Sequence, residues 1–285
     1  MEIYLFAAIL PVLLLCYYIY KKDVNPEPNR VLWKIFFYGC LTCIPIIFFE
    51  LVIQNIYPLE SASNFLSLFL NIFVSVAFIE EGFKWIVTRK FGYDIKEFDE
   101  IYDIIVYAVF ASLGFACVEN ILYVCKNGLG NALLRAFTSV PGHTCFGVIM
   151  GYYFSKAKTG EVQKKHTEYL KNMILSISIP VILHTLYDTI LLYSAQIESF
   201  LFIIIFLIFI SIMFIVCFKI VGKVSSENQK IYYSPKDEVI SEMLQENLYK
   251  DVPSSKNDIH FCSNCGNNVE GCNYCASCGQ KIREM

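Results

Sequence analysis

The sequence predicts an all-α membrane protein: a polytopic bundle of about seven transmembrane helices, followed by a small C-terminal zinc ribbon. The chain of 285 residues is 56 % hydrophobic, and its mean hydropathy of +0.50 lies well above that of a soluble domain. Two CxxC pairs near the C-terminus predict the ribbon. A net charge of only −3 gives no reason to expect nucleic acid as a partner.

Seven apolar stretches approach the roughly 20 residues that a helix needs to cross a bilayer. They lie at 3–20, 31–56, 65–87, 104–125, 133–155, 170–194 and 200–221. The first stretch has no basic residue before it, and Lys21 and Lys22 follow it. We therefore interpret it as a membrane helix rather than as a cleaved signal peptide.

Basic residues alternate between the connections. The segments near 21–34, 89–96 and 156–171 each hold three or more lysines and arginines, whereas those near 57–64 and 195–199 hold none. Because cytoplasmic loops are rich in these residues, a multi-pass protein of the cell membrane is predicted, with its N-terminus outside and its C-terminus in the cytoplasm.

The C-terminal part is predicted to be separate from the membrane domain. We expect a membrane domain at 1–222, a cytoplasmic linker with a short amphipathic helix at 223–258, and a zinc ribbon at 259–285. Ser234 suits the N-cap of the linker helix, and Pro235 suits its first turn.

Four thiolates in two CxxC pairs suit tetrahedral Zn²⁺, here as a structural ion that supplies the folding free energy of a very small domain. The predicted ligands are Cys262, Cys265, Cys275 and Cys278. The alternative is a reduced, metal-free tail. We expect the ribbon to bind a protein partner or to regulate the membrane domain.

Ionisable side chains inside the apolar stretches indicate a functional site, because a charge in hydrocarbon costs a few kcal/mol or more. Glu80 and Glu81 point about 100° apart on one helix, and Lys84 lies close enough to contact either. A buried ion pair that holds the bundle together and a pair of carboxylates that activates water explain this segment equally well.

Three further segments add polar groups. His184 and Asp188 lie four residues apart, so Asp188 can accept a hydrogen bond from one imidazole nitrogen and leave the other aimed at a substrate. Glu119 and Asn120 add a carboxylate and an amide, and His143 adds a second imidazole. Each of these groups alone could serve only to hold neighbouring helices together. Their combination in one bundle favours a hydrolytic enzyme.

The glycines that follow His143 have a simpler interpretation. Gly147 and Gly151 lie four and eight residues after it, and a stripe of small residues lets another helix approach closely. We expect both to be packing residues.

The polar groups have two other interpretations. Glutamates and histidines could bind a catalytic Zn²⁺, but the H-E-x-x-H spacing is absent, so no cofactor is expected at the active site. A non-catalytic scaffold would keep these groups for helix packing and recruit a partner through the ribbon.

The motifs together resemble the PrsW family of bacterial intramembrane proteases, which is related to the CAAX-processing and bacteriocin-processing enzymes. The resemblance covers roughly 65–194 and rests on EExxK from Glu80, GFAxxENILY at 114–123, PGHxxFGxxMGYY at 141–153, and HxxxD from His184. Departures are Ile104, where glycine is common, and Tyr187, where tryptophan is common.

The resemblance implies a glutamate-dependent endopeptidase in the bilayer, with a membrane protein as substrate. Well-known members make the first cut in a single-span anti-sigma factor during a stress response. The implied catalytic residues are Glu80, Glu81, Glu119, His143 and His184, with Lys84, Asn120 and Asp188 in support.

The expected depths of the site residues in the membrane do not agree with a single site. From the expected helix ends, Glu80 falls toward the cytoplasmic side, and Glu119 and His184 fall toward the outer side. Either the third helix begins after residue 65 or the site is a tall chamber.

Overall fold

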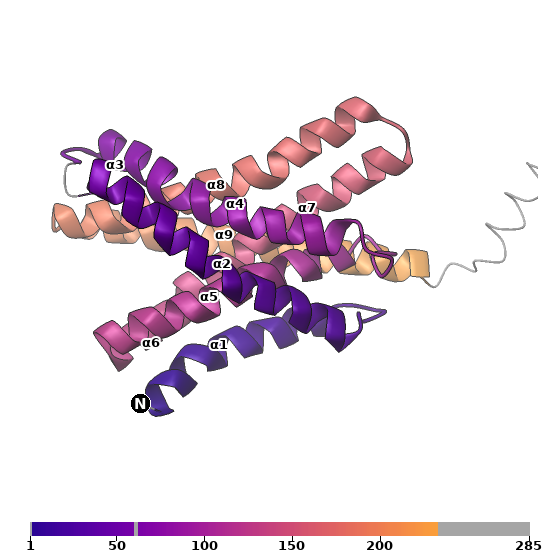
Figure 1. The fold of residues 1–285 in the computed structure, drawn as a ribbon, viewed down its shortest axis with the longest axis horizontal. Helices are drawn as coiled ribbons and strands as arrows, with labels where there is room; N and C mark the ends of the chain where they lie inside the picture. Colours follow the sequence, from indigo (N-terminus) through magenta and orange to yellow (C-terminus); the bar gives the residue numbers. More distant parts are fainter. Residues whose placement is uncertain (1, 60–61, 233–285) are drawn as a thin grey trace, which may run out of the picture. The chain divides into compact units, whose positions relative to one another are not determined.

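The computed structural model describes residues 2–59 and 62–232, and within these ranges the only regular secondary structure is helical. The predicted all-α class is thereby confirmed (Figure 1). The helices are α1 (Glu2–Lys21), α2 (Asn29–Ile56), α3 (Phe65–Ile72), α4 (Phe78–Thr88), α5 (Asp103–Asn127), α6 (Leu129–Phe137), α7 (Ser139–Val162), α8 (His166–Gln196) and α9 (Phe200–Tyr232).

Two π-helical segments make α3 and α4 one continuous element. The segment η2 (Phe73–Ala77) joins α3 to α4, and η3 (Arg89–Tyr93) extends α4 at its far end. The third predicted span therefore runs over 65–93, six residues longer than the 65–87 expected.

Within residues 2–59 and 62–232, six elements are long and apolar enough to cross a membrane, so the chain is a multi-pass membrane protein. The fifth predicted stretch, 133–155, differs from expectation because the chain breaks at Thr138. Its first part belongs to the short helix α6, and the remainder forms α7, which buries most of its side chains. In Figure 1, α7 runs beside α5 and α8.

Local sequence explains where several helices begin and end. Pro28 precedes α2 and supplies the fixed φ that suits a helix start. Asn64 caps α3 reciprocally: its side chain accepts from the Ser67 amide at 2.9 Å, and its own amide donates to the Ser67 hydroxyl at 3.2 Å. Gly128 ends α5 with a φ of +81°, a conformation that favours glycine.

Helix α5 is the centre of the bundle and approaches α2 at glycines. A Cβ on Gly39 would lie 2.2 Å from the Ala111 carbonyl oxygen, and one on Gly114 would lie 2.0 Å from the Phe36 carbonyl oxygen. Backbone contacts of this kind position α5 with little freedom to shift.

The predicted packing stripe on α7 also contacts α5. A Cβ on Gly147 would come within 2.9 Å of the Val109 Cα, and one on Gly151 within 2.5 Å of the Ile105 Cα. The expected packing role of both glycines is confirmed.

Helix α9 extends to Tyr232, past the expected domain boundary at 222. The predicted zinc ligands and the linker helix at Ser234 lie in 233–285, outside the described residues. The division into three domains and the zinc ribbon stay predictions.

Candidate active site

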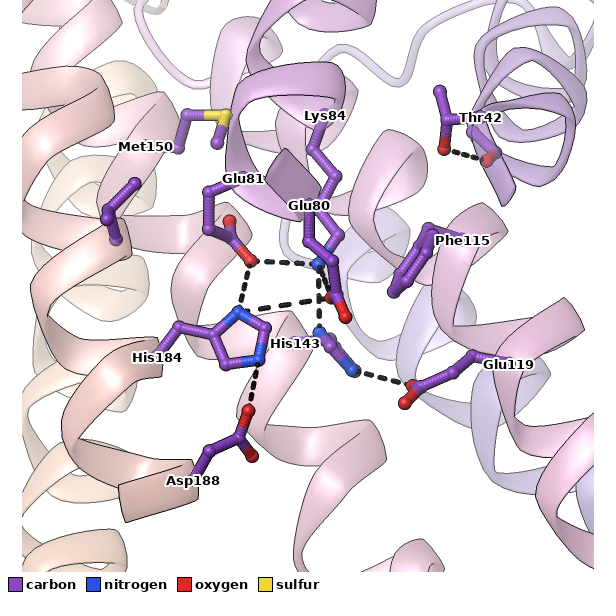
Figure 2. Close-up of polar contacts among 12 residues, drawn as sticks. Thr42, Glu80, Glu81, Lys84, Phe115, Glu119, His143, Met150, His184 and Asp188 are labelled. Atoms are coloured by element: carbon purple, nitrogen blue, oxygen red, sulfur yellow. Dashed lines mark hydrogen bonds and ion pairs between the residues drawn. The ribbon is translucent and has the colours of Figure 1, made fainter. Parts of the chain in front are cut away.

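Polar side chains from four helices converge in the middle of the bundle (Figure 2). Helix α4 supplies Glu80, Glu81 and Lys84, and α5 supplies Glu119. Helix α7 supplies His143, and α8 supplies His184 and Asp188. The structure thus brings together seven of the eight residues that were predicted as catalytic or supporting.

The expected difference in depth between these groups is absent. The third span begins at Phe65 as predicted but ends at Tyr93, so Glu80 lies near its middle. Helix α8 runs over His166–Gln196, and His184 also lies near its middle. Neither a late start of the third helix nor a tall chamber is needed.

Lys84 is the hub of the cluster, and its side chain is fully buried. Its Nζ lies 3.1 Å from Glu80 Oε2, 2.8 Å from Glu81 Oε1 and 3.1 Å from His143 Nδ1. An ammonium has three hydrogens to donate, and these three acceptors use all of them. The spacing allowed Lys84 to contact either glutamate, and in the structure it contacts both.

His184 lies between two carboxylates. Its Nδ1 is 3.0 Å from Glu81 Oε1, and its Nε2 is 3.3 Å from Asp188 Oδ2. Because a carboxylate only accepts, this arrangement is best satisfied when both ring nitrogens carry hydrogen, as in an imidazolium. The predicted contact with Asp188 is present, but the second nitrogen faces Glu81 instead of being left for a substrate.

His143 has a different pair of neighbours, which favours a neutral ring. Its Nδ1 accepts from the Lys84 ammonium, so the hydrogen belongs on Nε2, which lies 2.9 Å from Glu119 Oε2. His143 thereby links the α4 cluster to α5.

Glu119 also binds an arginine that sequence reasoning did not assign to the site. Arg135 Nη2 donates to Glu119 Oε2 at 2.6 Å, and Arg135 Nε donates to Asn120 Oδ1 at 2.9 Å. Asn120 in turn donates to the Ala8 carbonyl oxygen on α1 at 2.8 Å. Asn120 therefore positions Arg135 and α1, and its side-chain hydrogen bonds are to these partners and not to the α4 carboxylates.

A cavity of about 380 Å³ opens beside the cluster. Its walls include Glu80, Glu119, Arg135, His143, His184 and Asp188. Glu81 and Lys84 do not line it, so they lie behind this wall. The two adjacent glutamates thus differ in access: Glu80 faces the cavity and Glu81 does not.

The cavity wall also contains Glu50 of α2, another residue that sequence reasoning missed. Its Oε1 is buried and has no hydrogen-bond partner among the described residues. The signal was available, because Glu50 is an acidic residue inside an apolar stretch, like the glutamates that were identified.

The fold and the site define a polytopic membrane protein with carboxylates and imidazoles beside a cavity within the bundle. A family model described as "PrsW family intramembrane metalloprotease" matches residues 27–216. The chain belongs to this family, and the expectation of an intramembrane protease is confirmed.

Curated relatives named Protease PrsW support the assignment. The chain is 44 % identical to the protein from Oceanobacillus iheyensis over 186 residues, which are 65 % of this chain and 81 % of the relative. It is 36 % identical to the one from Halalkalibacterium halodurans over 224 residues, or 78 % and 96 %. It is 38 % identical to the Bacillus subtilis protein, with 65 % and 81 % covered. No solved structure matches this chain.

The word metalloprotease in the family description requires a test of whether the site fits a metal ion. Glu80, Glu81 and His184 offer donor atoms within 4.8 Å of one another, and these atom types suit Zn²⁺. However, the Lys84 ammonium already lies 2.8–3.1 Å from both carboxylates. A dication close to this ammonium would be repelled, so the site does not fit a metal while Lys84 holds this position.

Proposed function

We propose that the protein hydrolyses a peptide bond of a membrane protein with a water molecule activated by Glu80. The observation that carries this proposal is the difference between the two adjacent glutamates. Glu80 lines the cavity, whereas Glu81 lies behind it and contacts Lys84 at 2.8 Å and His184 at 3.0 Å. A general base must reach the water that it deprotonates, and Glu80 satisfies this condition.

The remaining groups have supporting roles in this proposal. Glu81 holds the Lys84 ammonium and the His184 ring, and it thereby fixes the charges beside Glu80. His184 and Arg135 are cavity-lining cations suited to stabilise the oxyanion that forms when water attacks a carbonyl group. Glu119 orients Arg135 and His143.

The proposed substrate is a single-span membrane protein, and an anti-sigma factor is the specific expectation from the family resemblance. The cavity wall includes Gln54 near the end of α2 and Leu192 near the end of α8, so the cavity extends toward this end of the bundle. The charge of the loops puts that end outside the cell. Under this orientation, cleavage would occur in the outer part of the bilayer.

Two isosteric variants test the general base. Glu80→Gln removes the charge and keeps the shape, and we expect cleavage of a co-expressed membrane substrate to fall by about a hundredfold or more. Glu168→Gln is the matched control, because Glu168 is exposed on α8 and does not line the cavity, and this variant should cleave normally. Normal cleavage by Glu80→Gln would show that the proposed base is wrong.

Metal analysis tests the mechanism separately. In the full-length protein, changing the four ribbon cysteines to serine removes the predicted zinc ligands from the tail. We expect this variant to contain no stoichiometric zinc and to retain activity after dialysis against a chelator. Stoichiometric zinc together with chelator-sensitive activity would show instead that the membrane site uses a metal.

A further inference from the structure

A second group of carboxylates gathers at the end of the bundle opposite to the N-terminus. Asp23 and Glu27 belong to the connection between α1 and α2, and Asp99, Glu100 and Asp103 belong to the segment that enters α5. Both connections lie at this end in Figure 1. Oxygens of Asp23, Glu100 and Asp103 lie within 4.8 Å of one another, as do oxygens of Glu27, Asp99 and Asp103. Asp103 is thus shared by two groups of three.

Three members of this acidic cluster are buried, and their charges are poorly compensated. Asp23 is 7 % exposed, Glu27 is 5 % exposed and Asp103 is fully buried. Asp103 Oδ2 accepts from the amides of Asp99 at 3.1 Å and Glu100 at 2.7 Å. Asp103 Oδ1 and Asp23 Oδ2 are buried without a hydrogen-bond partner among the described residues.

Among the described residues, no basic side chain neutralises these three buried carboxylates. Within residues 2–59 and 62–232, the ion pairs involve none of Asp23, Glu27, Asp99 and Asp103. Burial raises the pKa of Asp23 to about 6 and that of Glu27 to about 7. Buried carboxylates are normally paired or bound to a metal, so this cluster has the character of an incomplete site.

The ligand chemistry is that of a hard cation. All the donors are oxygens, with neither imidazole nor thiolate among them, which suits Ca²⁺ or Mg²⁺ and not a softer metal. Two ligands on opposite sides of Ca²⁺ lie roughly 4.6–5.2 Å apart, because each is about 2.3–2.6 Å from the ion. The donor oxygens in each group of three lie within 4.8 Å of one another, so they can belong to the coordination shell of one ion.

We propose that Asp23, Glu27 and Asp103, with Asp99 and Glu100, bind a hard divalent cation of the Ca²⁺ and Mg²⁺ class. The ion would tie the α1–α2 connection to the first turn of α5. Because α5 also carries Glu119 of the candidate active site, this contact would hold the central helix from its other end.

The test is thermal unfolding of the full-length protein in detergent, first freed of metal with a chelator and then titrated with CaCl₂ or MgCl₂. Potassium chloride at equal ionic strength controls for screening. At a cation concentration a hundredfold above Kd, we expect the unfolding temperature to rise by roughly 5–10 °C. No rise beyond that caused by potassium chloride, with either cation, would overturn the proposal.

Variants locate the effect. Asp23→Asn/Glu27→Gln should abolish the cation-dependent rise and, without cation, should unfold at the wild-type temperature or above, because two buried charges are removed. Asp99→Asn, at an exposed position, should weaken the cation-dependent rise. This variant provides the test if the double variant does not fold. Glu97→Gln/Glu168→Gln changes two exposed acids and should respond like wild type. An unchanged response in both cluster variants would overturn the proposal.

Discussion

Replacing Lys84 with methionine should be among the most destabilising single changes in this bundle. The substitution removes the ammonium that donates to Glu80, Glu81 and His143, and it preserves much of the side-chain volume. Removing one partner of a buried ion pair costs about 3–5 kcal/mol, because it leaves a buried charge uncompensated. For a domain of this size, the unfolding temperature should fall by roughly 6–20 °C.

A second variant separates the charge effect from simple loss of contact. In Lys84→Met/Glu81→Gln, one negative and one positive charge are both removed, and Glu80 can still pair with His184, whose Nδ1 lies 3.9 Å from Glu80 Oε2. We therefore expect the double variant to recover much of the lost stability. Both variants can be compared by thermal unfolding of the purified protein in detergent.

The control is Lys219→Met on the exposed side of α9, which should change stability by no more than about 0.5 kcal/mol. Two results would refute the reasoning. One is a Lys84→Met protein that unfolds within about 2 °C of wild type. The other is a double variant that is less stable than Lys84→Met alone, because the ammonium would then not be needed to balance the carboxylates.

Three further predictions concern packing, the cavity wall and the tail. Gly151→Ala would place a Cβ 2.5 Å from the Ile105 Cα and should cost about 1–3 kcal/mol in thermal unfolding. Gly222→Ala, with nothing within 4 Å, should be neutral, and equal effects would argue against close α5–α7 packing. Arg135→Gln removes the 2.6 Å contact with Glu119 and should lower substrate cleavage by about tenfold or more, whereas unchanged cleavage would show that this pair is dispensable. Cys262→Ser should abolish zinc binding by the tail while the protein stays in the membrane and keeps its peptidase activity; an abundant, inserted but inactive variant would place the ribbon in the catalytic machinery.

Much of the fold and of the candidate site could be predicted because bilayers restrict what a sequence can contain. Apolar stretches of span length marked the membrane helices, and ionisable residues inside them marked the cluster. Spacing then predicted contacts within one helix, such as His184 with Asp188 and Lys84 with the glutamate pair.

Other features depend on contacts between helices, which the spacing of residues within one helix does not predict. Arg135 contacts Glu119 because the chain turns back at Gly128 and breaks at Thr138. Pro141 in the first turn of α7 is compatible with a break there, but it does not determine the direction of α6. The unequal access of Glu80 and Glu81 to the cavity depends on the positions of other helices, and adjacent residues on one helix do not reveal this difference in the sequence. Asn120 was assigned to the site, yet its partner is the Ala8 carbonyl oxygen of the first helix.

The π-helical segments on either side of α4 each absorb about one extra residue within a single turn. In regular α-helical winding, one extra residue would instead rotate everything beyond it by about 100° around the helix axis. Deleting one residue within Phe73–Ala77 would therefore restore regular winding and leave Glu80 directed toward the cavity. The segment η2 is thus a place in the third span where the chain length can change without redirecting the glutamate pair.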